Sequence, residues 1–323
     1  MKGLASEEDF IACIDRHFPN AHRHVVVGRG DDCAVLACPE RLCVSTDLFI
    51  EDVHFRRSYF RPEEIGHKAL AVNVSDVAAM GGVPLGFSLA LMTPPGMTRE
   101  YADALFAGMS GLAAAYGMVL TGGDLSRGGV LGLSITVWGE PVPGRRFLRR
   151  GGCRPDDVLF AVGSLGLARA GLCALEASGR DALRLYPEAC AAHLTPNPQV
   201  SAGQLLARYP SVALMDLSDG LARDVPRLVG LDRDGGLGAA LELHEDDLHD
   251  EVMAYAIANG LDPVEEAFAG GEDYALLGAC PEDDFEALRE EVQGVVRVGT
   301  VTADGLLTLN GLPPSNSGFD HFA

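Results

Sequence analysis

The chain has 323 residues and a mass of 34.1 kDa, with 46 acidic and 25 basic residues and a formal net charge of −21. A chain of this length has more residues than a single hydrophobic core usually accommodates, so we expect two domains. The negative charge argues against nucleic acid and against an anionic membrane surface as partners, because both would repel it. The segment after Lys2 has no signal-peptide apolar stretch, and no apolar run is long enough to span a bilayer, which predicts a cytoplasmic protein.

Predicted helices and strands alternate along the first half of the chain. Ser6 as an N-cap, followed by apolar residues on one side, predicts a helix over 6–17. A buried strand over 41–50 runs into Asp47, and a helix over 61–82 begins with Pro62 and two glutamates. The further expected elements are a strand over 85–92, a helix over 98–116, and strands over 118–124 and 131–139.

A stretch rich in Pro, Gly and Arg (139–157) interrupts this order, and the alternation restarts behind it. The segment SVALMDLSDGLARDV (211–225) again shows a buried strand, a carboxylate at its end, a glycine and a helix. We therefore predict an α/β protein with domains 1–150 and 151–323. The other expected elements are strands over 158–163, 295–301 and 305–310, a strand following 270–274, and helices over 165–178 and 281–292.

A set of aspartates lies at the ends of apolar runs or beside Gly, Ser or Thr: Asp31, Asp47, Asp76, Asp124, Asp216 and Asp219. Singly, such a residue is more often a turn residue or a helix cap. Strand ends of α/β proteins bind ligands, however, and carboxylates gathered there repel one another unless cations compensate. Mg²⁺ meets this need, since it takes oxygen ligands and shares its shell with phosphates. The acidic pair that follows Gly30 is explained in the same way, as a metal-binding feature.

Other catalytic signatures are absent from the sequence. The only two lysines, Lys2 and Lys68, do not belong to a P-loop motif. Phosphates would therefore be held by metal, by backbone N–H groups near Gly122 and Gly123, and by arginines such as Arg150. The eight cysteines form no C-x-x-C pair and match no common zinc pattern. We expect them to be small buried thiols in a reducing compartment.

Seven segments resemble the thiamine-monophosphate kinase family in their order and spacing. They are GRGDDCAVL, VSTDLFIEDVHF, IGHKALAVNVSDVAAMGGVP, TGGDLSRG, MDLSDGLARD, AGGEDYALL and SGFDHFA, and they run from about residue 28 to the last residue. This family belongs to an ATP-binding superfamily with aminoimidazole ribonucleotide synthetase, selenide water dikinase and hydrogenase maturation protein E. The resemblance implies a two-domain aminoimidazole ribonucleotide synthetase-like fold, with an N-terminal mixed sheet at a homodimer interface and a C-terminal α/β domain.

The resemblance also implies direct in-line transfer of the γ-phosphoryl group of ATP to thiamine monophosphate, with several Mg²⁺ ions. Matched residue by residue, the implied metal ligands are Asp31, Ser45, Thr46, Asp47, Asp76, Asp124, Asp216 and Asp219. Gly123, Asp124, Arg150 and Ser218 would contact ATP, and His54, Glu272 and Phe319 would contact the thiamine part. Transfer between two anions mainly requires charge neutralisation and placement. The acceptor phosphate is already ionised, so no general base is assigned.

Alternatives remain open for single residues and for the function. His54 could be a surface residue, Glu272 could cap a turn, and Phe319 could belong to a docked tail. The family pattern has Glu where this chain has Ala275, and more commonly Gly where it has Asp52. The alternative functions are another ATP-dependent member of the superfamily, or a nucleotide- or thiamine-phosphate-binding protein without turnover.

Overall fold

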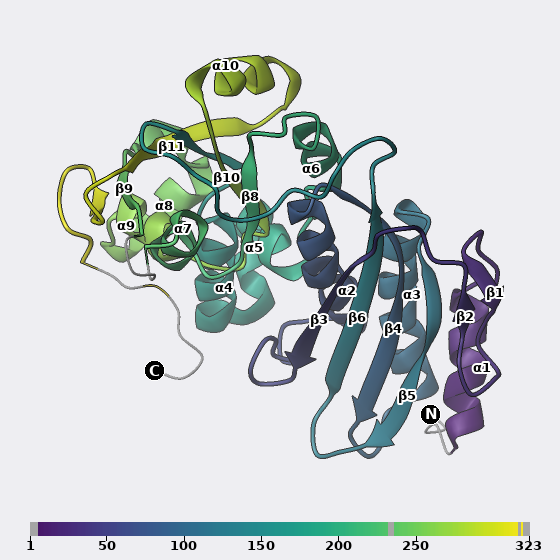
Figure 1. Ribbon diagram of the computed structural model, residues 1–323. Helices are drawn as coiled ribbons and strands as arrows, with labels where there is room; N and C mark the ends of the chain where they lie inside the picture. The colour runs from purple at the N-terminus through teal and green to yellow at the C-terminus, as the bar shows by residue number, and fades with distance from the viewer. Residues whose placement is uncertain (1–5, 232–235, 316–317, 319–323) are drawn as a thin grey trace. The chain divides into compact units, whose positions relative to one another are not determined.

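The computed structural model describes residues 6–231, 236–315 and 318 (Figure 1). It consists of two compact units. The first comprises residues 1–77 and 83–141, and the second comprises 78–82 and 142–323. The boundary between the two units thus follows Pro141, which lies within the Pro-, Gly- and Arg-rich stretch 139–157. The short segment 78–82 belongs to the second unit.

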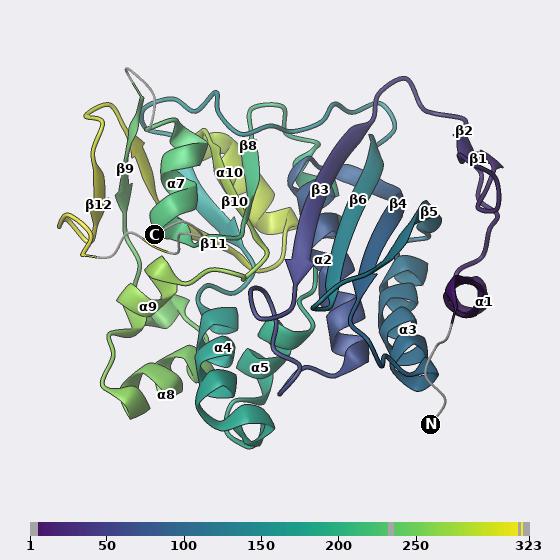
Figure 2. The same ribbon diagram turned by 90° about the horizontal axis from the view of Figure 1, so that it is seen from below.

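A four-stranded mixed sheet forms the centre of the first unit. Its strand order is β3 (Cys43–Ile50), β6 (Gly132–Pro141), β4 (Gly82–Thr93) and β5 (Val119–Arg127). Strands β3 and β6 are antiparallel, whereas β4 and β5 are parallel. Helices α2 (Pro62–Ala79) and α3 (Arg99–Ala115) cover one face of this sheet, as the two views in Figures 1 and 2 show. The helices and strands predicted for this half of the chain are therefore present.

Helices α2 and α3 touch backbone to backbone. A Cβ atom on Gly66 would lie 1.9 Å from the carbonyl oxygen of Leu105, and one on Gly108 would lie 1.9 Å from that of Glu63. Glycine is required at both positions because any side chain would drive the helices apart. This close contact holds α2 firmly against its neighbours, and α2 carries Asp76, one of the predicted metal ligands.

Three small elements precede the sheet. Helix α1 (Glu7–His17) has the predicted N-cap Ser6, whose hydroxyl accepts the backbone N–H of Asp9. Strands β1 (Val25–Val27) and β2 (Val35–Leu36) form a short antiparallel pair that the sequence did not reveal. All eight cysteines are free thiols, and Cys33 and Cys38 are exposed, so the expectation of buried thiols is wrong for these two.

A six-stranded sheet forms the centre of the second unit. The order is β12 (Leu307–Leu309), β9 (Gly238–Leu241), β11 (Val295–Thr302), β7 (Val158–Val162), β10 (Ala275–Cys280) and β8 (Ala213–Leu217). Neighbouring strands are antiparallel, except that β12 runs parallel to β9. Strands β7 and β10 and the edge strand β8 are buried at every residue. A sheet that is apolar on both faces must be covered on both sides.

Helices cover this second sheet on both faces. The helices are α4 (Leu167–Ser178), α5 (Pro187–Leu194), α6 (Val200–Leu206), α7 (Leu221–Val229), α8 (Asp250–Asn259), α9 (Pro263–Ala269) and α10 (Glu282–Glu291), with two 3₁₀ turns at Gly179–Arg184 and Glu245–Asp247. Leu159 and Ala161 of β7 belong to the main core with residues of α4, α7 and α9. Phe160, between them, packs on Phe285 of α10, so α10 covers the opposite face.

Candidate active site

An oxygen-rich cluster forms where β3 passes α2. Ser45 and Asp47 lie on the same side of the strand because side chains alternate along it. The Ser45 hydroxyl donates a hydrogen bond to the carboxylate of Asp76, and the backbone N–H of Asp47 donates to Asn73 Oδ1 at 3.2 Å. The strand and the helix therefore bring together three side chains that were predicted to bind metal.

The environment of this cluster disfavours negative charge. Burial, and after it the neighbouring charge of Asp76, raise the pKa of Asp47 to about 6. A cation would relieve both effects, since it supplies the opposite charge that a buried carboxylate needs. Carboxylate and hydroxyl oxygens are the donors that Mg²⁺ prefers. The three side chains thus fit a hard divalent cation.

Thr46 lies on the other side of β3. Its hydroxyl is 2.8 Å from that of Thr136, its partner in the β3–β6 register, and the residue is exposed. The hydroxyl therefore points away from Ser45 and Asp47. A metal-binding role for Thr46 stays a prediction, and this geometry restricts it to the backbone carbonyl oxygen.

The glycine turn (residues 28–32) is tied to its unit by Arg29. The Asn20 side chain accepts the backbone N–H of Arg29 at 2.7 Å and donates to its carbonyl oxygen at 2.9 Å. The Arg29 guanidinium donates to the carbonyl oxygens of Leu120 and Phe18, each at 2.7 Å. The arginine that follows Gly28 is thus an anchor that presents the acidic residues after it.

The two other predicted ligands of the first unit are exposed. Asp31 accepts the backbone N–H of Asp32 at 2.8 Å, and Asp124 accepts the Ser126 hydroxyl at 2.8 Å. A carboxylate can accept several hydrogen bonds, so each of these two can still bind another partner. Their proposed metal contacts stay predictions.

Gly123 precedes Asp124 at a point where β5 closely approaches β4. A Cβ atom on Gly123 would lie 1.7 Å from the carbonyl oxygen of Leu89. A Cβ on the preceding Gly122 would meet nothing within 4 Å. Only the second glycine is therefore required by packing, and it fixes the position of the strand that carries Asp124.

In the second unit, the loop between β8 and α7 is organised by a buried carboxylate. Asp224 is completely buried, and its Oδ2 accepts the backbone N–H groups of Ser218 at 3.0 Å and Asp219 at 2.9 Å. Its Oδ1 accepts Arg227 Nη1 at 2.8 Å. Burial raises the pKa of Asp224 to about 6, while its hydrogen bonds with the backbone of Asp219 and with Arg227 lower it. Asp224 thus positions the loop that follows Asp216, itself a buried residue of β8.

Arg227 also pairs with one of the predicted ligands. Its Nη1 lies 2.5 Å from Asp219 Oδ2. A cation bound by Asp219 would have to share this carboxylate with the guanidinium. The assignment of Asp219 as a metal ligand stays a prediction.

The segment around Glu272 adopts an unusual backbone. Glu272 and Tyr274 have φ angles of 68° and 47°, in the left-handed region that side chains rarely adopt. The Glu272 N–H donates to the Ser218 carbonyl oxygen at 2.8 Å, and its carboxylate is 3.1 Å from Nδ1 of the buried His193. Strain of this kind persists where surrounding contacts enforce it, and it concentrates at functional sites.

Asp273, between these two residues, caps helix α4. Its carboxylate accepts the backbone N–H of Gly166 at 2.7 Å and that of Ala168 at 3.1 Å. The helix has no side-chain cap of its own at Gly166. Removal from solvent raises the pKa of Asp273 to about 7, although the N–H groups it accepts lower it. The same bonds hold the strained segment in place.

The other predicted contacts are less defined. His54 accepts the backbone N–H of Ile50 at its Nδ1, at 3.1 Å, and its ring packs on Phe49. Arg150 is exposed. Phe319 lies outside the described residues. The roles of all three predicted residues stay predictions.

Both departures from the family pattern have structural explanations. Asp52 has a φ angle of 66°, which glycine adopts freely and Asp tolerates better than most residues. Ala275 is 1% exposed and belongs to the main core of the second unit. Packing explains the small residue at this position.

Sequence reasoning missed four residues that contact the predicted ligands or their neighbours, Asn73 in the first unit and His193, Asp224 and Asp273 in the second. Asp224 and Asp273 both lie within segments that carried the family resemblance. Their carboxylates bind backbone N–H groups, and this type of contact leaves no spacing pattern in a sequence. His193 falls in helix α5, which was not predicted.

Comparisons with known proteins identify the family. Residues 30–140 match the family model of the AIR synthase related protein, N-terminal domain, and residues 154–311 match that of its C-terminal domain. Thiamine-monophosphate kinase of Bacillus subtilis is 35% identical over 84% of this chain and 82% of its own. That of Salmonella typhimurium is 36% identical over 93% of each. The chain belongs to the thiamine-monophosphate kinase family.

Solved structures of the family share the fold. Thiamine-monophosphate kinase from Stenotrophomonas maltophilia superposes with a TM-score of 0.82 at 28% identity, covering 95% of this chain and 97% of that one. AaThiL complexed with AMPPCP and TMP superposes with a TM-score of 0.78 at 27% identity over the whole of both chains. The hydrogenase maturation protein HypE, 22% identical with a TM-score of 0.74, shares the fold alone. Among the described residues, no helix is both long enough and apolar enough to cross a membrane.

Proposed function

We propose that this protein transfers the γ-phosphoryl group of ATP to thiamine monophosphate, yielding thiamine diphosphate and ADP. The carrying observation is the Ser45–Asp47–Asp76 cluster, a partly buried set of oxygen donors whose charge calls for a cation. The family membership points to this reaction among those of the superfamily. The AaThiL complex with AMPPCP and TMP supports a nucleotide and a thiamine phosphate as the two ligands.

Magnesium is the metal that we propose for this cluster, since all of its donors are oxygen atoms. When bound, it would neutralise the negative charge of the phosphoryl oxygens, which is the main need in transfer between two anions. Asp47 and Asp76 would hold the ion in the first unit, with Asp31, Asp124 and the Thr46 carbonyl as further ligands. In the second unit, Asp216 and Asp219 would hold further ions.

The protein's own residues would bind and orient the substrates. Gly123, Asp124, Arg150 and Ser218 would contact ATP, and Ser218 is fixed for this role by Asp224. His54, Glu272 and Phe319 would contact the thiamine part. The acceptor oxygen belongs to an ionised phosphate, so no side chain needs to remove a proton.

We further propose a homodimer formed through the open face of the first sheet. On β3, residues Val44 and Leu48 are 63% and 57% exposed, and they alternate with Ser45 and Asp47, which face α2. Two large apolar side chains on an edge strand are suited to an interface with a second copy. A cytoplasmic location stays a prediction.

The decisive experiment measures ADP and thiamine diphosphate formed from ATP and Mg²⁺. The purified chain is supplied with thiamine monophosphate, with thiamine, with an aminoimidazole precursor, or with no acceptor. We expect equal amounts of ADP and thiamine diphosphate when thiamine monophosphate is the acceptor, and neither product with the other acceptors or with no acceptor. Turnover with the aminoimidazole precursor instead would assign the chain to another activity of the superfamily. Binding of both ligands without product would indicate a binding protein.

A further inference from the structure

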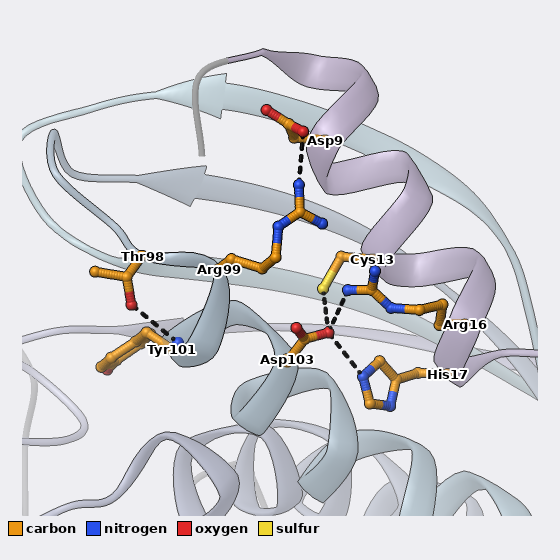
Figure 3. Close-up of polar contacts among 8 residues, drawn as sticks. All are labelled: Asp9, Cys13, Arg16, His17, Thr98, Arg99, Tyr101 and Asp103. Carbon is orange, nitrogen blue, oxygen red and sulfur yellow. Dashed lines mark hydrogen bonds and ion pairs between the residues drawn. The ribbon is translucent and has the colours of Figure 1, made fainter. Parts of the chain in front are cut away.

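A second cluster of potential metal ligands lies in the first unit, between helices α1 and α3 (Figure 3). Cys13 and His17 are four residues apart on α1, so their side chains lie on the same face of that helix. Asp103 faces them from α3. Its Oδ1 lies 2.9 Å from Cys13 Sγ and 3.3 Å from His17 Nε2.

The three donor atoms already converge. The sulfur, the imidazole nitrogen and the carboxylate oxygen all lie within 4.8 Å of one another. Over residues 6–231, 236–315 and 318, this is the one group of three or more His, Cys, Asp or Glu residues that meets this condition. Ligands of a tetrahedral ion at about 2.0–2.3 Å require separations of this order.

The chemistry of these donors differs from that of the magnesium cluster. Thiolate and imidazole favour Zn²⁺ and similar soft or borderline ions, whereas Mg²⁺ takes oxygen ligands. An ion that binds to Cys13 must displace the thiol proton, which a thiophilic ion does and Mg²⁺ does not.

The Asp103 carboxylate already forms an ion pair with Arg16. Arg16 Nη2 lies 2.5 Å from Asp103 Oδ1, and the Arg16 side chain is 48% exposed. The guanidinium can move into solvent, because about half of the Arg16 side chain is already exposed and the Asp103 side chain is itself 34% exposed. The carboxylate would then exchange one positive partner for another.

We propose that Cys13, His17 and Asp103 bind one Zn²⁺ ion, with water completing the coordination, and that the ion joins α1 to α3. Binding releases the Cys13 proton to solvent and leaves the thiolate as a ligand. The ion replaces Arg16 as the partner of Asp103. Because these residues are separate from the proposed magnesium ligands, this inference does not depend on the proposed kinase activity.

The test uses the full chain, stripped of metal with a chelator and kept reduced. Titration with Co²⁺ reports thiolate coordination through a sulfur-to-cobalt charge-transfer band in the near ultraviolet, and competition with Zn²⁺ gives the zinc affinity. We expect one equivalent per chain. Cys13→Ser should abolish the band, and His17→Gln should weaken zinc binding about ten-fold or more. Arg16→Gln should strengthen binding, because the competing cation is removed.

Matched controls separate this site from the other cysteines. Cys33→Ser and Cys38→Ser remove exposed thiols elsewhere in the unit and should leave the band unchanged. Zn²⁺ should raise the melting temperature of the wild-type chain but not that of Cys13→Ser, a substitution small enough to preserve the helix. Absence of the band in the wild type would overturn the proposal. So would equal zinc affinity in Cys13→Ser, or loss of the band in either control.

Discussion

The carboxylate of Asp273 accepts the backbone N–H of Gly166 at 2.7 Å, across 107 residues of sequence. This contact caps helix α4 and at the same time fixes the strained segment that carries Glu272. Helix stability and the position of a proposed substrate contact therefore depend on a single side chain.

The raised pKa of Asp273 predicts a pH-dependent contribution to stability. Its folded-state pKa is about 7, above the ordinary value of 3.8 for an aspartate, so the folded chain holds this proton more tightly than the unfolded chain. The contribution of Asp273 to the free energy of unfolding should therefore fall between about pH 4 and 7 and stay level above that range. The maximum change is about 1.4 kcal/mol for each unit of pKa difference. Urea unfolding of wild type and Asp273→Asn from pH 4.5 to 8.5 measures it. A constant difference between the two proteins would contradict the prediction.

Asp224→Asn should disturb the loop at Ser218 without removing any proposed ligand. The amide can accept on one side only, so either the loop N–H groups or Arg227 would face an N–H donor. We expect a loss of about 1–3 kcal/mol in stability and a KM for MgATP raised several-fold. Asp246→Asn, at an exposed position, is the matched control. Steady-state kinetics with unchanged KM would show that Asp224 has a purely structural role.

Asp47→Asn should abolish turnover, because it removes a negatively charged oxygen from the proposed magnesium cluster. Stability without Mg²⁺ should be equal to that of the wild type or higher, since the variant relieves repulsion with Asp76. Product formation and thermal melting, each with and without Mg²⁺, test both parts. Turnover at the wild-type rate would exclude Asp47 as a metal ligand.

The two adjacent glycines of β5 should respond differently to the same substitution. Gly123→Ala forces a Cβ against the Leu89 carbonyl oxygen and should destabilise the first unit by about 2 kcal/mol or more. Gly122→Ala meets open space and should be well tolerated. Denaturant unfolding of the two variants gives the comparison, and similar losses in both would contradict the close approach of β5 to β4.

The proposed homodimer makes a prediction about the open sheet face. Val44→Lys combined with Leu48→Lys should convert a dimer into a monomer in sedimentation velocity, because it places charges within the apolar contact. Leu185→Lys, at a site that is 73% exposed in the second unit, should leave the dimer intact. A monomeric wild-type chain at micromolar concentration would refute the proposed assembly.

Local signals in the sequence predicted much of the fold. The Ser6 cap, the strand that carries Asp47 and the helix that begins at Pro62 were all evident from residue type and spacing. The β1–β2 pair and the helices α5, α8 and α9 were missed. Strands β1 and β2 and helices α5 and α9 contain too few residues to show a clear periodicity. Family motifs indicated Ser45, Asp47 and Asp76 as a set, and the structure brings them together. The supporting residues could not be predicted, since their partners are backbone groups brought close only by folding.

The anchoring of the glycine turn has a practical consequence for shortened versions of this protein. A chain that starts after Phe18 would retain every aspartate proposed to bind magnesium. It would nevertheless lose one of the two carbonyl oxygens that hold the Arg29 guanidinium, together with the Asp15 carboxylate at 3.1 Å. The first helix therefore carries none of the proposed magnesium ligands, but it helps to hold the turn that contains Asp31, and we expect its removal to lower the rate of turnover.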